Sequence, residues 1–143
     1  MPKRNTAVTL EDYRALAEFR YQLRLYLALS DHAARSVGLH PGQYRLLLTL
    51  KGLPDGTLPT IRNLAERLGL RHHSTVELVD RLEVGGLIYR ERSEHHRSFV
   101  FVRLTPKGES VLRKLVASRK AELQKAGPVL VKALNTLTKK ANK

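Results

Sequence analysis

Arginine and histidine side chains gather in one stretch of the chain, between residues 71 and 97. Guanidinium and imidazole groups donate hydrogen bonds to phosphate oxygens and to guanine, glutamate accepts from cytosine, and valine contacts the thymine methyl group. The residues of this kind are Arg71, His72, His73, Ser74, Val76, Glu77, Arg81, Arg90, Arg92, His95, His96 and Arg97. Together they predict a surface that contacts duplex DNA.

The adjacent histidines do not have the spacing of a metal site. His72 and His73 would diverge by about 100 degrees on a helix, and His95 and His96 would alternate across a strand or turn. Neither pair has the i, i+4 spacing or the cysteine and carboxylate neighbours of a zinc site. The chain also has no Gly-rich phosphate loop, nucleophile motif or paired acids in a plausible cleft. We therefore predict no metal, no cofactor and no enzymatic activity.

Two amphipathic helices are expected to position these residues. In the first, the apolar residues that share one face are Ile61, Leu64, Ala65 and Leu68. Thr60 is placed to cap this helix and Gly69 to end it. In the second, the residues that share a face are Thr75, Leu78, Val79 and Leu82, and Gly85 and Gly86 end the run. The short turn between the helices predicts a helix-turn-helix, although two such helices also fit simple core packing.

A basic β-hairpin is expected to follow the second helix. Residues 87–92 and 98–104 are β-prone, and residues 93–97 join them as a five-residue loop. The arginines of this hairpin are Arg90, Arg92, Arg97 and Arg103. A basic hairpin in this position predicts a wing that holds the DNA backbone or places an arginine in the minor groove. The alternative is a solvated hairpin whose charge is incidental.

The expected DNA contacts divide into two kinds. Phosphates are assigned to Arg71, Ser74, Arg90 and Arg92, and base edges to His72, His73, Val76 and Glu77. Arg97, at the tip of the wing, is expected to enter the minor groove or hold its edge. For Arg81, phosphate contact and pairing within the protein both stay open.

From Thr60 to Gly108 the chain resembles the MarR family of multiple-antibiotic-resistance regulators. The residues that carry the resemblance are IRNLAERLGL, LVDRLEVGGLIYR and VRLTPKGE, in this order and spacing. The wing departs from the family pattern, which has Asp-x-Arg where His95, His96 and Arg97 stand here. An ungapped alignment places Ser98 at the family arginine; one extra strand residue places Arg97 there and His95 at the aspartate, which we prefer. The wing-tip arginine then lacks its usual carboxylate.

The resemblance implies a dimeric, sequence-specific transcription regulator. In the family the N- and C-terminal helices interlock across a twofold axis, so the target is an inverted repeat of double-stranded DNA. The implied mode of action is repression that a small, often aromatic effector relieves by binding between the dimer helices and the DNA-binding lobe. Tyr26, His40 and Tyr44 are the candidate lining of such a pocket, and ordinary packing is the alternative for each. The alternative functions are a winged-helix protein-interaction module and a non-specific basic DNA-binding protein without effector control.

The rest of the chain predicts a mainly α-helical single domain, residues 1–143, with the hairpin as its wing. Residues 9–37 and 106–140 are expected to form the dimerisation helices, and residues 40–104 the DNA-binding lobe. Between Thr9 and Gly38 the apolar residues lie on more than one stripe, which favours cover by a second subunit.

Two local features of these helices are expected from the sequence. His40 and Pro41 should begin a helix whose inner face holds Tyr44, Leu47 and Leu48. The pair Gly127 and Pro128 should break or kink the last helix.

Charge and composition limit the partners. Lys and Arg number 26 against 13 Asp and Glu, a net charge of +13, which indicates nucleic acid or an acidic membrane surface. A membrane binder would leave a bulky apolar helix face exposed, whereas these helices have other uses for their apolar faces, so we predict no membrane partner. Neither a signal peptide nor an apolar span is visible, and cysteine is absent, so a cytoplasmic protein is expected.

Overall fold

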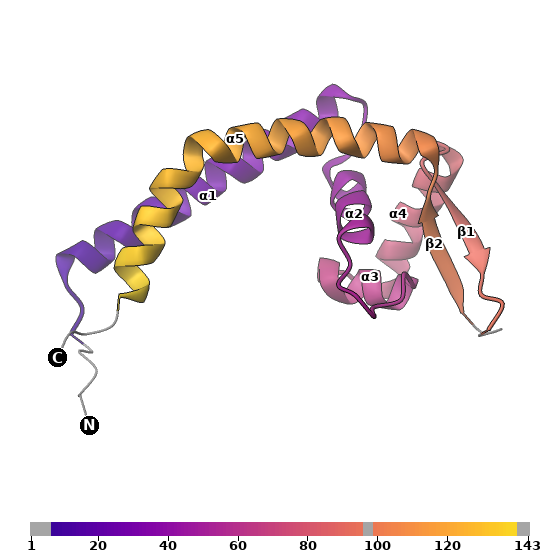
Figure 1. Cartoon of the computed structure of the whole chain (residues 1–143), viewed down its shortest axis with the longest axis horizontal. Helices are drawn as coiled ribbons and strands as arrows, with labels where there is room; N and C mark the ends of the chain where they lie inside the picture. The colour runs from indigo at the N-terminus through magenta and orange to yellow at the C-terminus, as the bar shows by residue number, and fades with distance from the viewer. Residues whose placement is uncertain (1–6, 96–98, 140–143) are drawn as a thin grey trace. The chain divides into compact units, whose positions relative to one another are not determined.

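The structure is a computed structural model that describes residues 7–95 and 99–139. Five helices and one hairpin follow each other along the chain (Figure 1). Their bounds are α1 (Leu10–Ser36), α2 (Pro41–Lys51), α3 (Ile61–Leu68), α4 (His72–Val84), β1 (Ile88–Arg92), β2 (Val100–Leu104) and α5 (Pro106–Thr138). The predicted fold class, mainly α with a small β-hairpin wing, is confirmed.

The chain divides into two compact units. We call residues 31–116 the winged unit, and residues 1–30 with residues 117–143 the helical unit. The division falls inside α1 and inside α5, so each of these long helices contributes to both units.

The winged unit has a continuous apolar core. Leu46 and Leu47 of α2, Leu64 of α3, Val79 of α4 and Val102 of β2 have no exposed surface. The prediction that Leu48 belongs to the inner face is wrong, because 42% of this residue is exposed and Leu46 is buried instead. Helix α2 has more leucines than one face can hold, so packing against its neighbours selects among them.

Local sequence explains where α3 begins and ends. The Thr60 hydroxyl accepts a hydrogen bond from the Asn63 amide at 3.2 Å, and Gly69 ends the helix in the left-handed conformation with φ 67°. Both predicted roles are confirmed.

The wing is held at its base from two sides. Strands β1 and β2 pair antiparallel, with Ile88 opposite Leu104 and Arg92 opposite Val100. The loop before α3 joins β2 at its other edge, where the Val102 amide donates to the Pro59 carbonyl at 2.8 Å. The start of α3 and the base of the wing therefore form one hydrogen-bonded assembly.

The LTPKG segment ties the end of the wing to the turn after α4. The Thr105 hydroxyl donates to the Gly86 carbonyl at 2.6 Å, and Lys107 Nζ donates to the Gly85 carbonyl at 3.2 Å. At Gly108 a Cβ atom would lie 2.0 Å from the Leu87 carbonyl oxygen. Only glycine lets α5 pass this close to the backbone.

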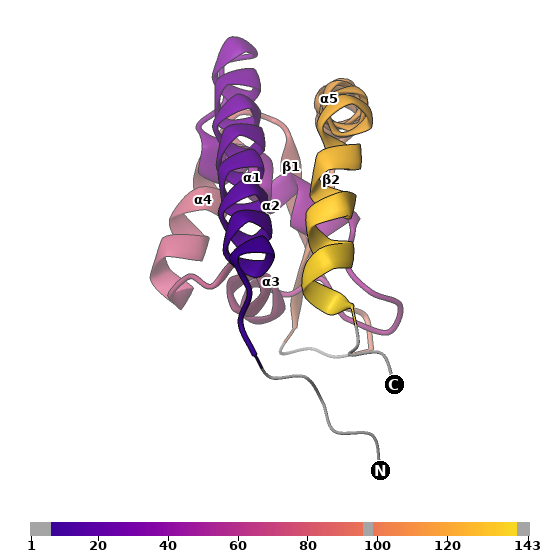
Figure 2. The same cartoon turned by 90° about the vertical axis from the view of Figure 1, so that its left-hand side faces the viewer.

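In the helical unit, α1 and the C-terminal part of α5 run alongside each other (Figures 1 and 2). The predicted break at Gly127 and Pro128 is wrong, because α5 is helical through both residues as far as Thr138. A proline inside a helix costs about 3 kcal/mol through a lost hydrogen bond and a steric clash. Packing beyond it opposes that cost: Ala133, one turn and a residue later, is 5% exposed. Within the described residues, no helix is both long and apolar enough to span a membrane.

Candidate nucleic-acid interface

Helix α4 is fixed along one side and exposed along the other. Thr75, Val79 and Leu82 are buried in the core, and the Thr75 hydroxyl donates to the Arg71 carbonyl at 3.1 Å. Helical spacing places His73 and Glu77 on the opposite side, where both are exposed. Buried side chains therefore set which residues of α4 face outward.

The structure brings most of the predicted contact residues of α4 to the surface. Arg71, His72 and His73 are exposed at the N-terminal end, and Ser74 and Val76 are half-buried beside them. Arg81 is exposed and its side chain has no hydrogen bond or ion pair among the residues that the structure describes. Of the two options for Arg81, pairing within the protein is thus not seen there.

Arg90 links the wing to α4 instead of facing outward. Its Nη2 lies 2.7 Å from Asp80 Oδ1, its Nη1 pairs with Glu83 Oε1, and its amide donates to Glu83 Oε2 at 3.2 Å. Partial burial lowers the pKa of Arg90, but the hydrogen bonds to the two carboxylates outweigh burial and raise it above its ordinary value. The structure does not support the predicted phosphate contact of Arg90; this residue acts as a brace.

Sequence reasoning missed the two partners of this brace. Asp80 and Glu83 are three residues apart on α4, so they share one side of the helix. An arginine on the strand that follows is the partner which that spacing allows. We call Asp80, Glu83 and Arg90 the wing brace.

The outer part of the wing is described only in part. Arg92 and His95 are exposed, whereas His96 and Arg97 lie outside the described residues, so their DNA contacts stay predictions. Arg103, the fourth arginine of the hairpin, lies over the Phe101 ring at 5.2 Å from its centroid. Its guanidinium packs on its own strand.

Charge is not concentrated on this surface. Residues 60–104 contain eight arginines and six acidic residues, a net charge of +2. Residues 105–143 contain ten basic and two acidic residues, a net charge of +8. Most of the surplus that indicated a polyanionic partner therefore belongs to the C-terminal part of the chain.

The three candidate effector residues have different surroundings. In the winged unit, His40 caps α2: its Nδ1 accepts from the Gly42 amide at 3.0 Å and its amide donates to Gln43 Oε1 at 2.7 Å. Tyr44 is 6% exposed and belongs to the core. In the helical unit, the Tyr26 ring is half-buried with the Arg119 guanidinium 5.9 Å from its centroid. Across the described ranges, no three His, Asp or Glu side chains gather as metal ligands would.

Two short helices joined by a tight turn, with one exposed helix face and an antiparallel hairpin after it, define a winged helix-turn-helix protein. The MarR family profile matches residues 37–97. A MarR family protein from Bacillus stearothermophilus is 30% identical in its solved structure, with a TM-score of 0.62 over 82% of this chain and 80% of that one. AbsC, a MarR family transcriptional regulator from Streptomyces coelicolor, is 21% identical with a TM-score of 0.70, over 94% of each chain, and supports the fold.

Among curated proteins, the chain is similar to the uncharacterized HTH-type transcriptional regulator YfiV of Bacillus subtilis (strain 168). The two are 32% identical over 84 residues, which is 59% of this chain and 51% of YfiV, so the match spans about half of the curated relative. The chain belongs to the MarR family. The resemblance drawn from the sequence is confirmed, and membership of a family of transcription regulators agrees with the prediction that the chain is not an enzyme.

Proposed function

We propose that the protein is a dimeric, sequence-specific DNA-binding regulator that represses transcription from an inverted-repeat operator. The observation that carries this proposal is the exposed side of α4, with His73 and Glu77, next to a wing held on α4 by the wing brace. A rigid wing and an outward helix face are the two parts that a winged helix needs for backbone and base contacts.

The contacts divide by chemistry. The α4 residues proposed for base edges are His72, His73, Val76 and Glu77. The residues proposed for phosphates are Arg71, Ser74, Arg81, Arg92 and, at the wing tip, Arg97. Arg90 contributes by position, because it neutralises Asp80 and Glu83, which would otherwise repel the DNA backbone.

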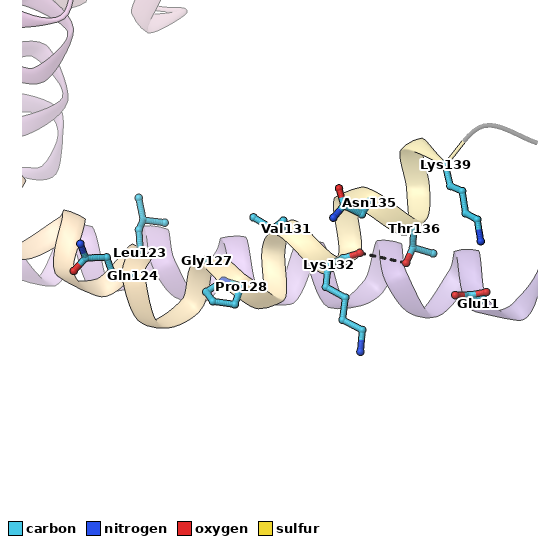
Figure 3. A pocket seen from close by; sticks show the side chains of 10 residues that line it. All are labelled: Glu11, Leu123, Gln124, Gly127, Pro128, Val131, Lys132, Asn135, Thr136 and Lys139. Carbon is cyan, nitrogen blue, oxygen red and sulfur yellow. Dashed lines mark hydrogen bonds between the residues drawn. The ribbon is translucent and has the colours of Figure 1, made fainter.

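A second copy of the chain is proposed to cover the helical unit. Leu10, Tyr13 and Leu16 of α1 are more than half exposed, and Leu123 and Leu134 of α5 are 39% and 42% exposed. Figure 3 shows a groove along α5 in which Leu123, Pro128 and Val131 line one side; its volume is about 710 Å³. Isolated helices do not leave this much apolar surface in water, and a twofold partner would place two α4 helices about 34 Å apart.

Relief of repression by a small effector is proposed from family membership. A ligand need only favour one separation of the two α4 helices by a few kcal/mol. Tyr26, His40 and Tyr44 stay the proposed lining. One observation supports a ligand near Tyr26: Arg119 is 7% exposed, and in the described structure its Nε and Nη1 have no hydrogen-bond partner. Such donors favour an acceptor from outside the chain.

The decisive experiment is selection of bound fragments from a pool of random duplexes. We expect an inverted repeat whose half-sites are about one helical turn apart. Bound fragments without a shared sequence would identify a non-specific DNA-binding protein. No enrichment of any duplex would favour the protein-interaction module.

A further inference from the structure

The lobe proposed to read DNA is nearly neutral, which leaves the strong basic character of the chain without a role. Attraction of duplex DNA at long range depends on net positive charge near the phosphates. Residues 60–104 supply +2, and two of their six acids are needed to hold Arg90. Residues 105–143 supply +8.

Three lysines on α5 form an ordered, exposed row. Lys125, Lys132 and Lys139 are spaced by seven residues, so they lie on one side of the helix about 10.5 Å apart along its axis. All three are exposed, and the ion pair seen for this row in the described structure joins Lys125 to Glu122 at 4.0 Å. We call these residues the lysine row.

The lysine row fits phosphates better than any directional ligand. Lysine is a compact, strongly hydrated charge on a flexible stem, and it contacts phosphate as a point charge without reading bases. Figure 3 shows that Lys132 extends away from the α5 ribbon, without contact to the other labelled side chains. Exposed like charges repel each other, and a polyanion removes that repulsion.

We propose that the lysine row binds the phosphate backbone of duplex DNA without sequence preference. The proposal rests on the proposed function, because it gives the second, sequence-independent part of the same DNA affinity. Duplex DNA is favoured over an anionic membrane for one reason. The apolar residues of α5 that would enter a lipid surface, such as Leu123 and Leu134, are the ones that a second copy is proposed to cover.

The test compares K125Q/K132Q/K139Q with the unaltered chain. Glutamine keeps helix propensity, so the change removes charge with little effect on folding. Affinity is measured for a random duplex and for the selected operator, between about 50 and 200 mM salt. Loss of three phosphate contacts should reduce the slope of log K against log salt by about 2 to 3. Affinity for both duplexes should fall by the same factor, and operator preference should not change.

A matched control variant, R20Q/R24Q/R35Q, removes the same charge from exposed positions of α1. We expect its slope to change by less than about 1. An equal loss in both variants would assign the effect to net charge and overturn the proposal, as would an unchanged slope in the lysine variant. Vesicles of phosphatidylglycerol are the last arm. Row-dependent vesicle binding with unchanged DNA affinity would replace DNA by a membrane.

Failure of this inference differs from failure of the proposed function. If the random-duplex selection yields no shared sequence but the lysine variant still loses affinity, the lysine row stands and the operator does not. If the selection yields an inverted repeat and the lysine variant binds like the unaltered chain, the operator stands and the lysine row does not.

Discussion

The winged and helical units bury their apolar residues to different degrees. Every large side chain that is completely buried lies in the winged unit, including Leu46, Leu64 and Ile88. In the helical unit the buried residues are Ser30, Arg119 and Ala133, while leucines and tyrosines of α1 are half exposed or more. The winged unit supplies its own core, whereas the helical unit has an apolar surface that only another molecule can cover.

The largest expected effect comes from one glycine in each unit. Gly108→Ala should lower the free energy of unfolding by about 3 kcal/mol or more, because the new Cβ would lie 2.0 Å from the Leu87 carbonyl oxygen. Gly127→Ala, with nothing within 4 Å of the new Cβ, should raise it by roughly 0.5 to 1 kcal/mol. Urea unfolding measures both. Equal effects would contradict the difference in packing.

The second prediction concerns cover of the helical unit. Leu134→Glu should weaken self-association by roughly thirtyfold or more, because a charge would be buried at the proposed dimer surface. Sedimentation over a range of concentrations measures this. Val84→Glu is the control, since Val84 is 91% exposed on α4 and should leave self-association unchanged. A monomeric unaltered chain at micromolar concentration would remove the dimer proposal itself.

The third prediction tests the wing brace. Arg90→Ala should lower stability by roughly 1 kcal/mol and lower DNA affinity for all sequences, since the wing loses its link to α4 and Asp80 and Glu83 lose their counter-charge. Combining it with Asp80→Ala should give less than the sum of the two single effects. Strictly additive effects would show that the pair does not act together.

The fourth prediction concerns the wing tip, which the structure does not describe. Arg97→Ala should weaken binding to every duplex and reduce the salt slope by about 1, as for one lost phosphate contact. Titration at several salt concentrations gives the slope. An unchanged slope would mean that the wing tip does not touch DNA.

The smallest effect is expected at the exposed side of α4. His73→Ala should relax preference at one or two symmetric operator positions, by about 1 kcal/mol each, and leave non-specific binding nearly intact. Repeating the random-duplex selection with this variant shows which positions relax. The same loss on every sequence would exclude His73 from base reading.

Local patterns were enough to predict the helix-turn-helix and the wing. Thr60, Gly69 and the apolar spacing of α3 act over one or two turns, and the hairpin depends on neighbouring strands, so each can be read without knowing the rest of the fold. The phosphate role expected of Arg90 failed because a carboxylate on another element decides where an arginine points.

Several features depend on contacts between distant residues, and only the folded chain decided them. Leu46 replaced Leu48 in the core, α5 continued through Pro128, and Gly108 met the Leu87 carbonyl. In each case the local preference is worth a few kcal/mol at most, which is the size of the packing energy that opposes or selects it. Sequence spacing therefore settled which elements form and which residues they expose to DNA, and tertiary packing settled which side chains are buried, braced or left uncovered.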